Sequence, residues 1–450
     1  MKIGIIGWGL EGQSAYRYFG PDHEYLIVNE QPSDKFPTGD NVKIQFVDKE
    51  KGYALRGSVT DLSYLDGIEN CDKIVFQPTA YFNLKKVFGN NQDFWAKATT
   101  AYDIFSEECP SKNIIGVTGT KGKGTTSTLI AKILQASGKT VHIGGNIGTP
   151  ILDLLPNIKP GDWVVWELAN FQLKPASHSP HIAVCLMITA EHLDWHPSME
   201  DYVQAKSNLF KYQKPDDIAI YLAGNKYSEE AAGVSAGVKI PYFANPGAYV
   251  REDGMIVIGE EEAEIIKTHD LKLIGQHNWQ NACAAITAIW QITNNVDAIR
   301  QVLTSFSGLE HRLELVRELN DVKYYDDSFG TNPDTAAVAL AAIIQPVVLI
   351  AGGYDRGIPM EPLIAAILKD RVKHVIAIGQ TGGKIAELLK DKGFKNVTTG
   401  PNNMADIVRA AKEIAEPGDA VLLSPAAASF DMFKNFEVRG SEFKKAVEAL

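Results

Sequence analysis

A glycine-rich segment between an apolar run and a helical pattern constrains this chain more than any other feature. Residues 116–126 read Gly-Val-Thr-Gly-Thr-Lys-Gly-Lys-Gly-Thr-Thr. Gly119, Gly122 and Gly124 lack a Cβ, so the backbone N–H groups can turn inward toward an anion. The helix N-terminus that follows adds the positive end of its dipole, and Lys123 can reach a terminal phosphate. The segment predicts a strand, a phosphate loop for ATP and a helix.

The loop departs from the usual phosphate-loop pattern at two positions. Val117 stands where the first glycine is usual, and Gly124 replaces the hydroxyl residue after the lysine, so Thr125 would have to serve the metal ion. An ordinary glycine-rich turn is the alternative interpretation. The predicted ATP-binding residues of the loop are Gly119, Thr120, Lys121, Gly122, Lys123, Gly124, Thr125 and Thr126.

Length and composition exclude several classes of protein. A chain of 450 residues suggests about three domains. The net charge of −11 argues against a nucleic-acid partner. Cys71, Cys109, Cys185 and Cys283 form no Cys-x-x-Cys pair and are expected to be buried thiols of a reducing compartment. Because the sequence has no signal-peptide layout and no apolar stretch long enough to cross a bilayer, we expect a cytoplasmic protein with no membrane partner. We also expect a monomer.

Apolar runs alternate with helical patterns along most of the chain. The alternation predicts α/β architecture with parallel sheets, with boundaries near residues 108 and 308. Residues 241–274 differ, because short alternating runs separated by glycines predict a small antiparallel sheet, and Gly275–Ile292 follows as a helix. The predicted strands are Lys2–Gly7, Tyr25–Asn29, Lys73–Gln77, Trp163–Glu167, His181–Thr189, Asp217–Leu222, Val322–Tyr325, Pro346–Ala351, His374–Ile378 and Ala420–Leu423.

A second glycine motif lies near the amino terminus. Residues 7–12 read Gly-Trp-Gly-Leu-Glu-Gly after a predicted strand, and Glu30 follows the next strand, where a carboxylate could hold a ribose diol. The motif predicts a diphosphate at a helix N-terminus and leaves the nucleoside open. An NAD(P) enzyme and a plain strand-to-helix turn remain alternatives.

Acidic and histidine residues follow two strands of the central region. Glu167 ends the predicted strand at 163–167, on the edge where a carboxylate can coordinate Mg²⁺ beside the phosphate loop. His192, Asp194 and His196 follow the next strand and could ligate a metal or orient a substrate. A zinc site competes, but no thiols join these residues. A packed structural role suits each histidine alone, whereas Glu167 and His192 together favour the metal.

Seven segments, in the same order along the chain, resemble the ATP-dependent Mur ligases of peptidoglycan synthesis. They are residues 119–126, 144–148, 167–173, 191–194, 275–282, 308–314 and 423–440. The last of them resembles the subgroup that adds glutamate to UDP-N-acetylmuramoyl-L-alanine. The resemblance implies three domains: a Rossmann-like UDP-substrate domain at 1–108, a central P-loop ATPase-type domain at 109–307, and a Rossmann-like amino-acid domain at 308–450.

The implied reaction is the ATP-dependent addition of D-glutamate to UDP-N-acetylmuramoyl-L-alanine through an acyl phosphate. The resemblance assigns catalysis to Lys123, His192 and Lys206. Beyond the loop, it assigns ATP contacts to Asn278, Asn281, Arg312 and Asp327. The UDP-substrate residues are Gly9, Leu10, Glu11, Glu30 and Asn146. The amino-acid residues are Thr331, Arg356, Ser429 and Phe436. Two Mg²⁺ ions are implied at Thr125, Glu167, His192 and Lys206, the lysine as a carbamate.

Four departures from the family pattern keep alternatives open. Phe329-Gly330 stands for a Lys-Ala pair, Ala169-Asn170 for two serines, Asn29-Glu30 for Asp-Thr, and residues 77–80 for a Ser-Pro-Gly turn. The sequence therefore supports the ATP half better than the UDP-sugar half, and it does not distinguish D- from L-glutamate. A folylpolyglutamate synthase-like ligase is the second hypothesis. An NAD(P) oxidoreductase or a nucleotide-binding regulatory protein built on residues 7–12 is the third, and it gives Lys123, Glu167 and His192 no role.

Two of the implied amino-acid residues also have plain structural interpretations. Ser429 could cap a helix instead of contacting an amino acid. Phe436 could be a core aromatic. These alternatives stand beside the ligand-binding roles that the resemblance implies.

Overall fold

The structure is a computed structural model of the whole chain. It describes every residue except 31, 32, 34, 48–60, 147, 194, 274 and 370. The chain forms two compact units. Unit 1 comprises Met1–Leu271 and Gln276–Ser305, and unit 2 comprises Lys272–Gly275 and Phe306–Leu450.

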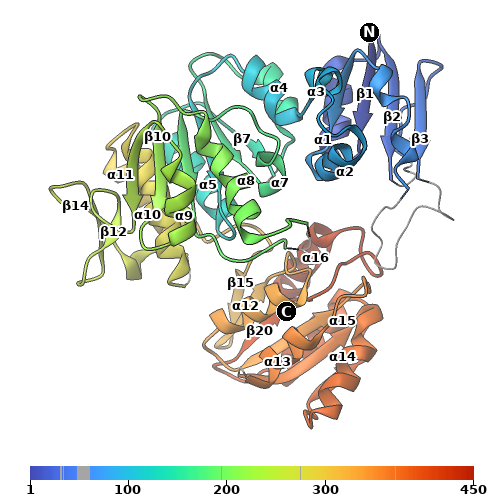
Figure 1. The fold of residues 1–450 in the computed structure, drawn as a ribbon. Helices are drawn as coiled ribbons and strands as arrows, with labels where there is room; N and C mark the ends of the chain where they lie inside the picture. Colours follow the sequence, from blue (N-terminus) through green and yellow to red (C-terminus); the bar gives the residue numbers. More distant parts are fainter. Residues whose placement is uncertain are drawn as a thin grey trace. The chain divides into compact units, whose positions relative to one another are not determined.

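The first sheet of unit 1 is parallel and carries the amino-terminal glycine motif (Figure 1). Its strand order is β3 (Val42–Phe46), β2 (Glu24–Asn29), β1 (Lys2–Ile6), β4 (Lys73–Phe76) and β5 (Ala98–Thr99). The accompanying helices are α1 (Leu10–Phe19), α2 (Tyr81–Phe88) and α3 (Gln92–Lys97), followed by α4 (Ala101–Glu108). Alternate residues of β1 enter different apolar clusters, since Ile3 and Ile5 pack on one face and Ile6 on the other. Helices therefore cover both faces, as parallel sheets require.

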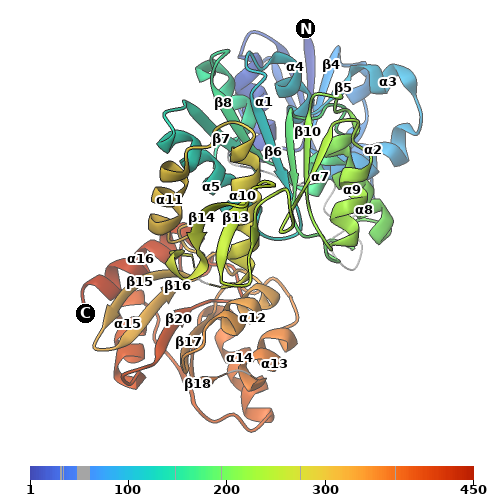
Figure 2. The same ribbon diagram turned by 90° about the vertical axis from the view of Figure 1, so that its left-hand side faces the viewer.

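The second sheet of unit 1 holds the phosphate loop and is also parallel. Its order is β11 (Val238–Tyr242), β10 (Ile218–Leu222), β9 (Ile182–Cys185), β6 (Ile114–Thr118), β8 (Trp163–Glu167) and β7 (Val141–Gly145). In Figure 2, α5 (Lys123–Ala136), α10 (His277–Trp290) and α11 (Val296–Ser305) lie on one side, with α8 (Met199–Lys211) and α9 (Lys226–Gly233) on the other. Two short helices, α6 (Ile151–Leu154) and α7 (Asn170–Leu173), follow β7 and β8.

A small antiparallel sheet confirms the prediction for residues 241–274. It consists of β12 (Tyr249–Val250), β13 (Met255–Ile258) and β14 (Ala263–Lys267). The helix predicted at Gly275–Ile292 is present as α10. The four cysteines are buried free thiols, as expected. Among the described residues, no helix combines the length and the apolar character that crossing a membrane requires.

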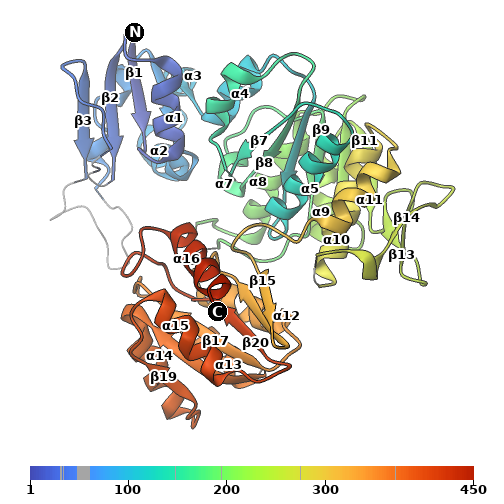
Figure 3. The same cartoon turned by 180° about the vertical axis from the view of Figure 1, so that it is seen from behind.

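Unit 2 is one mixed sheet covered by helices on both faces. The order is β15 (Glu314–Leu319), β16 (Val322–Asp326), β20 (Ala420–Leu423), β17 (Val347–Gly352), β18 (Val372–Ile378) and β19 (Val397–Thr399), with only the β15–β16 pair antiparallel. One face packs on α12 (Pro333–Ala342), α13 (Glu361–Lys369) and α14 (Gly379–Asp391). The other packs on α15 (Met404–Ile414) and α16 (Phe436–Glu448), which lie side by side in Figure 3.

The predicted α/β class with parallel sheets is confirmed, and one strand prediction is too long. The strand expected at His181–Thr189 ends at Cys185. Its neighbours β6 and β10 pair with β9 no further than Cys185, and after Thr118 the chain of β6 turns into the glycine loop. The domain boundaries at 108 and 308 stay predictions.

Candidate functional site

The loop between β6 and α5 depends on two glycines with positive φ. Gly122 is the N-cap of α5 with φ of 87°, and a Cβ there would lie 2.3 Å from Asn281 Oδ1. Gly119 has φ of 147°, and its Cβ would lie 2.6 Å from Leu186 Cβ. Side chains fit neither position, so the loop keeps the tight geometry that suits an anion at a helix N-terminus. The helix begins at Lys123, two residues before the predicted helical stretch.

Two lysines from distant parts of unit 1 converge on the loop. Lys123 Nζ donates to the Gly119 carbonyl at 3.0 Å and to the Thr120 carbonyl at 3.2 Å. Lys206 Nζ, from α8, donates to the same Gly119 carbonyl at 3.0 Å. The phosphate loop therefore holds two amines beside the position where the pattern places ATP phosphates.

Lys206 is buried, which changes its chemistry. Only 1% of the residue is exposed. Burial, reinforced by the nearby charge of Lys123, lowers the pKa of Lys206 to about 7. Much of the amine is therefore neutral, and so nucleophilic, at physiological pH. Tyr202 lies one helical turn earlier, with its ring 4.8 Å from Lys206 Nζ and its hydroxyl 3.1 Å from Thr120 Oγ1. Tyr202 was not among the predicted site residues, although its i, i+4 spacing to Lys206 is visible in the sequence.

Glu167 lies where the sequence predicted it, at the carboxyl end of β8 beside β6. The residue is almost fully buried, and Asn146 Nδ2 donates to its Oε1 at 2.8 Å. Asn146, predicted to bind the UDP substrate, is thus bonded to the predicted metal ligand. Thr125, the predicted hydroxyl ligand, lies in the first turn of α5. These oxygens are the ligand type that Mg²⁺ prefers.

The two histidines after β9 differ sharply. His192 has φ of 56° and stacks edge-on against Phe171 at 4.9 Å, with its Nε2 3.9 Å from Glu191. His196 is buried with both ring nitrogens engaged, Nε2 by Asn170 at 2.8 Å and Nδ1 by Asp201 at 2.6 Å. The packed role predicted for a lone histidine is thus confirmed for His196. Asp194 lies outside the described residues.

The two asparagines predicted to approach adenine are buried on α10. Asn281 Nδ2 donates to Asn278 Oδ1 at 2.9 Å, and Thr126 Oγ1 donates to Asn281 Oδ1 at 3.4 Å. Asn281 therefore stands against the phosphate loop itself. Its adenine contact stays a prediction.

The first sheet has a hollow of about 100 Å³ at the carboxyl ends of β1, β2 and β4. Glu30 lines this hollow, and burial raises its pKa. Glu11 points elsewhere, because Gln172 Nε2 of α7 donates to its carboxylate at 2.6 Å and burial raises its pKa. Gly9 caps α1, and Leu10 begins that helix with an exposed side chain. Among these predicted residues, Glu30 is the one that lines the hollow.

Unit 2 brings together the two residues predicted to reach the nucleotide. The Arg312 guanidinium lies 3.8 Å from the Phe329 ring centroid, and Asp327 accepts from Ser424 Oγ at 2.7 Å. Burial raises the pKa of Asp327 to about 7, partly offset by hydrogen bonds and by the Arg312 charge. Phe329, which departs from the family pattern, therefore orients a cation instead of supplying one.

The four predicted amino-acid residues stand on four different segments of unit 2. Thr331 donates its N–H to Phe329 O at 2.8 Å. Arg356 is exposed, with its guanidinium 5.7 Å from the Phe430 ring. Ser429 is buried, and Phe436 begins α16 with its ring 5.2 Å from that of Phe329. The N-cap of α16 is Asn435, so Ser429 is not its capping residue.

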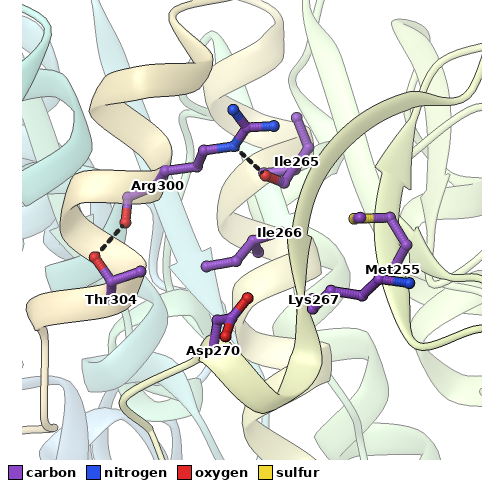
Figure 4. A pocket seen from close by; sticks show the side chains of 7 residues that line it. All are labelled: Met255, Ile265, Ile266, Lys267, Asp270, Arg300 and Thr304. Carbon is purple, nitrogen blue, oxygen red and sulfur yellow. Dashed lines mark hydrogen bonds between the residues drawn. The ribbon is translucent and has the colours of Figure 1, made fainter.

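A larger hollow, of about 420 Å³, lies between the small sheet and α11 (Figure 4). Its polar groups already have partners within the fold. Arg300 donates to the Ile265 and Glu264 carbonyls, and Lys267 bonds to Asp253. It contains none of the predicted residues. Size alone therefore does not mark the functional site.

Comparison with known proteins finds two family models that match this chain, one that includes the phosphate loop and one that lies within unit 2. Residues 117–289 match the family model of the Mur ligase middle domain, and residues 311–427 match the Mur ligase glutamate ligase domain.

Two curated relatives carry the same name. A UDP-N-acetylmuramoylalanine--D-glutamate ligase of Acetivibrio thermocellus is 38% identical, covering 100% of this chain and 96% of the relative. The protein of that name from Symbiobacterium thermophilum is 44% identical over 75% of each chain. The crystal structure of MurF ligase from Thermotoga maritima in complex with ADP shares the fold, with a TM-score of 0.57 at 16% identity over 99% of this chain and 95% of that one.

Proposed function

This chain belongs to the Mur ligase family, and we propose that it is the ATP-dependent enzyme that joins D-glutamate to UDP-N-acetylmuramoyl-L-alanine in peptidoglycan precursor synthesis. The observation that carries the proposal is the full-length similarity to a relative of that name, together with a loop on which two amines converge beside the strand that ends in the buried Glu167. A dehydrogenase would have no use for this arrangement.

The chemistry begins with two anions that repel each other. The acceptor carboxylate attacks the γ-phosphate of ATP, ADP leaves, and an acyl phosphate forms. Lys123 and the loop N–H groups stabilise the negative charge on the transferring phosphoryl group. In the structure Lys123 donates hydrogen bonds to two loop carbonyls. We infer that it replaces these hydrogen bonds with ones to phosphate oxygens when ATP binds.

Thr125, Glu167, His192 and Lys206, the last as a carbamate, would hold two Mg²⁺ ions, which supply positive charge on the phosphate oxygens. Lys206 suits carbamylation because its neutral amine can attack CO₂, forming an N–C bond and releasing one proton. The resulting anion lies beside the positive charge of Lys123. An attraction therefore takes the place of the repulsion that Lys123 exerts whenever Lys206 is protonated.

The second step uses the residues of unit 2. We propose that Arg356 pairs with a carboxylate of glutamate, since a guanidinium can bind it through two hydrogen bonds. Thr331, Ser429 and Phe436 would complete the pocket. The glutamate amine attacks the acyl carbon, phosphate leaves, and the nitrogen gives up a proton to form the amide. Glu30 in the first-sheet hollow would hold the nucleoside of the acceptor.

Besides the Mg²⁺ ions, the proposal requires three small molecules as partners: ATP, UDP-N-acetylmuramoyl-L-alanine and D-glutamate. Four buried thiols and a nucleotide-linked substrate favour a cytoplasmic enzyme. We propose a monomer, without nucleic-acid or membrane partners. A related ligase that uses L-glutamate or another acceptor is the alternative that the product must distinguish.

Mass spectrometry of the product tests the proposal. The chain, with ATP, Mg²⁺ and UDP-N-acetylmuramoyl-L-alanine, should convert D-glutamate into an amide of the acceptor. Lys123→Ala should abolish the product, whereas Lys132→Ala, an exposed lysine on the same helix, should retain it. An amide formed only with L-glutamate would refute the assigned amino acid, and no amide with either enantiomer would refute the acceptor.

A further inference from the structure

The guanidinium of Arg439 is buried in unit 2, where its hydrogen bonds to described residues go to hydroxyl and carbonyl oxygens and not to a carboxylate. Arg439 lies in the first turn of α16 and is 1% exposed. Its Nε donates to Ser328 Oγ at 2.9 Å and its Nη2 to Ser328 O at 2.8 Å. Its Nη1 donates to the carbonyls of Ala427 at 3.1 Å and Ala428 at 3.2 Å. One side chain thus fixes two loops by four hydrogen bonds.

This burial has an electrostatic cost that packing alone does not explain. Burial lowers the pKa of Arg439 to about 10, and the more distant Asp431, Asp326 and Asp327 partly offset it. A guanidinium stays protonated at neutral pH even so. An apolar residue would fill the space without burying a charge. The planar fork of arginine is what allows one group to hold several carbonyls at fixed angles.

The tethered loops carry the proposed amino-acid residues. Ser328 lies three residues before Thr331, and its Oγ donates to the Phe436 carbonyl at 2.8 Å. Ala428 directly precedes Ser429. Arg439 therefore connects the segments that carry Thr331, Ser429 and Phe436.

The loop that carries Arg356, the fourth proposed residue, is attached through the carbonyl of Ala428. The Ala428 carbonyl also accepts from the Tyr354 N–H at 2.9 Å, two residues before Arg356. At Gly353, a Cβ would lie 2.2 Å from that carbonyl and 3.3 Å from Arg439 Nη1. The backbone of the Arg356 loop thus packs directly against the Arg439 network.

We propose that Arg439 is the positioning residue of the glutamate pocket, holding the loops of Thr331, Arg356, Ser429 and Phe436 in register without touching the amino acid. This inference rests on the proposed function. A lysine at this position has one ammonium and cannot reproduce the fork, so the carbonyls would lose partners and the loops would shift.

Arg439→Lys tests the inference, with Arg409→Lys as matched control. Arg409 is exposed on α15 and bonds to Asp406. In Arg439→Lys, the KM for D-glutamate should rise about tenfold, as expected for one or two lost hydrogen bonds, while the KM for ATP and kcat stay within about twofold. Arg409→Lys should leave all three constants unchanged. An unchanged KM for glutamate, or an equal rise in every KM, would overturn the inference.

Hydrogen exchange separates this inference from the proposed function. Backbone amides at 328–331 and 427–429 should exchange about tenfold faster in Arg439→Lys than in Arg409→Lys. Unchanged exchange there would overturn the tether, whereas a wild-type protein that turns over no D-glutamate would overturn the function. If Arg439→Lys does not fold, Ser328→Ala replaces it, because that change removes the hydroxyl that accepts from Arg439 Nε and donates to the Phe436 carbonyl, and so cuts the same network from its other end. Its KM for glutamate should rise about threefold, and no rise would overturn the inference.

Discussion

Replacing Lys206 by methionine should make unit 1 more stable at neutral pH. The pKa of Lys206 is about 7 in the folded protein, against 10.5 for an exposed lysine. Each unit corresponds to about 1.4 kcal/mol, so burial disfavours the protonated amine by about 5 kcal/mol. Methionine fills a similar volume without a charge. Gly119 O, which loses the Lys206 hydrogen bond, still accepts from Lys123.

The pH dependence isolates this effect from packing changes. Between pH 7 and 10.5 the unfolded chain binds the Lys206 proton and the folded chain does not, so wild-type stability rises with pH in this window. Between pH 7.5 and 9.5, the unfolding free energy of wild type relative to Lys206→Met should therefore increase by about 2–3 kcal/mol. Below pH 7 the wild type bears the full free-energy cost of burying the protonated Lys206 amine.

Tryptophan fluorescence during urea denaturation measures this difference in unit 1 alone. All of the tryptophans lie in that unit: Trp8, Trp95, Trp163, Trp166, Trp195, Trp279 and Trp290. The buffers must be free of CO₂, and bicarbonate should then reduce the pH dependence if Lys206 is carbamylated. A wild-type-minus-variant difference that stays constant from pH 7.5 to 9.5 without CO₂ would refute the buried, deprotonated amine.

Three further predictions follow from the loop and from unit 2. Lys123→Ala should lower glutamate-dependent phosphate release at least about 100-fold in a coupled assay, with Lys132→Ala near wild type. Gly122→Ala should weaken ATP binding about tenfold by calorimetry, because left-handed backbone costs about 1–2 kcal/mol and its Cβ would meet Asn281; wild-type affinity would contradict this. The raised pKa of Asp327, about 7, makes the folded protein bind an extra proton between pH 3.8 and 7, so its contribution to stability falls as pH rises. Asp327→Asn should thus stabilise unit 2 at pH 8 but not at pH 4, measured by circular dichroism, and equal effects at both would refute this.

Local chemistry made the phosphate loop predictable from sequence. Glycines and a lysine between an apolar run and a helical pattern specify a strand, a turn and a helix without reference to distant residues. The carboxylate of Glu167 was predictable for the same reason, since the carboxyl ends of parallel strands share one edge. The structure confirms the position of both beside β6.

Other features depend on long-range packing that no local pattern encodes. Lys206 reaches Gly119 across 87 residues, so its burial and lowered pKa are invisible in the sequence of α8 alone. The strand predicted at His181–Thr189 was too long because apolar residues continue in the sequence beyond Cys185, the last residue that pairs with β6 and β10. Arg439 lies in a motif that was recognised by resemblance, yet its tethering role required the positions of two loops about 100 residues apart. The bond between Glu11 and Gln172 likewise had no local signal.

The most direct test of the account is phosphate release from ATP and Mg²⁺ with UDP-N-acetylmuramoyl-L-alanine, measured with D-glutamate, with L-glutamate and with no amino acid. The account predicts continuous release only with D-glutamate. Sustained release with L-glutamate alone would contradict the amino-acid assignment. No release under any of the three conditions, from folded protein that binds ATP, would contradict the assigned acceptor.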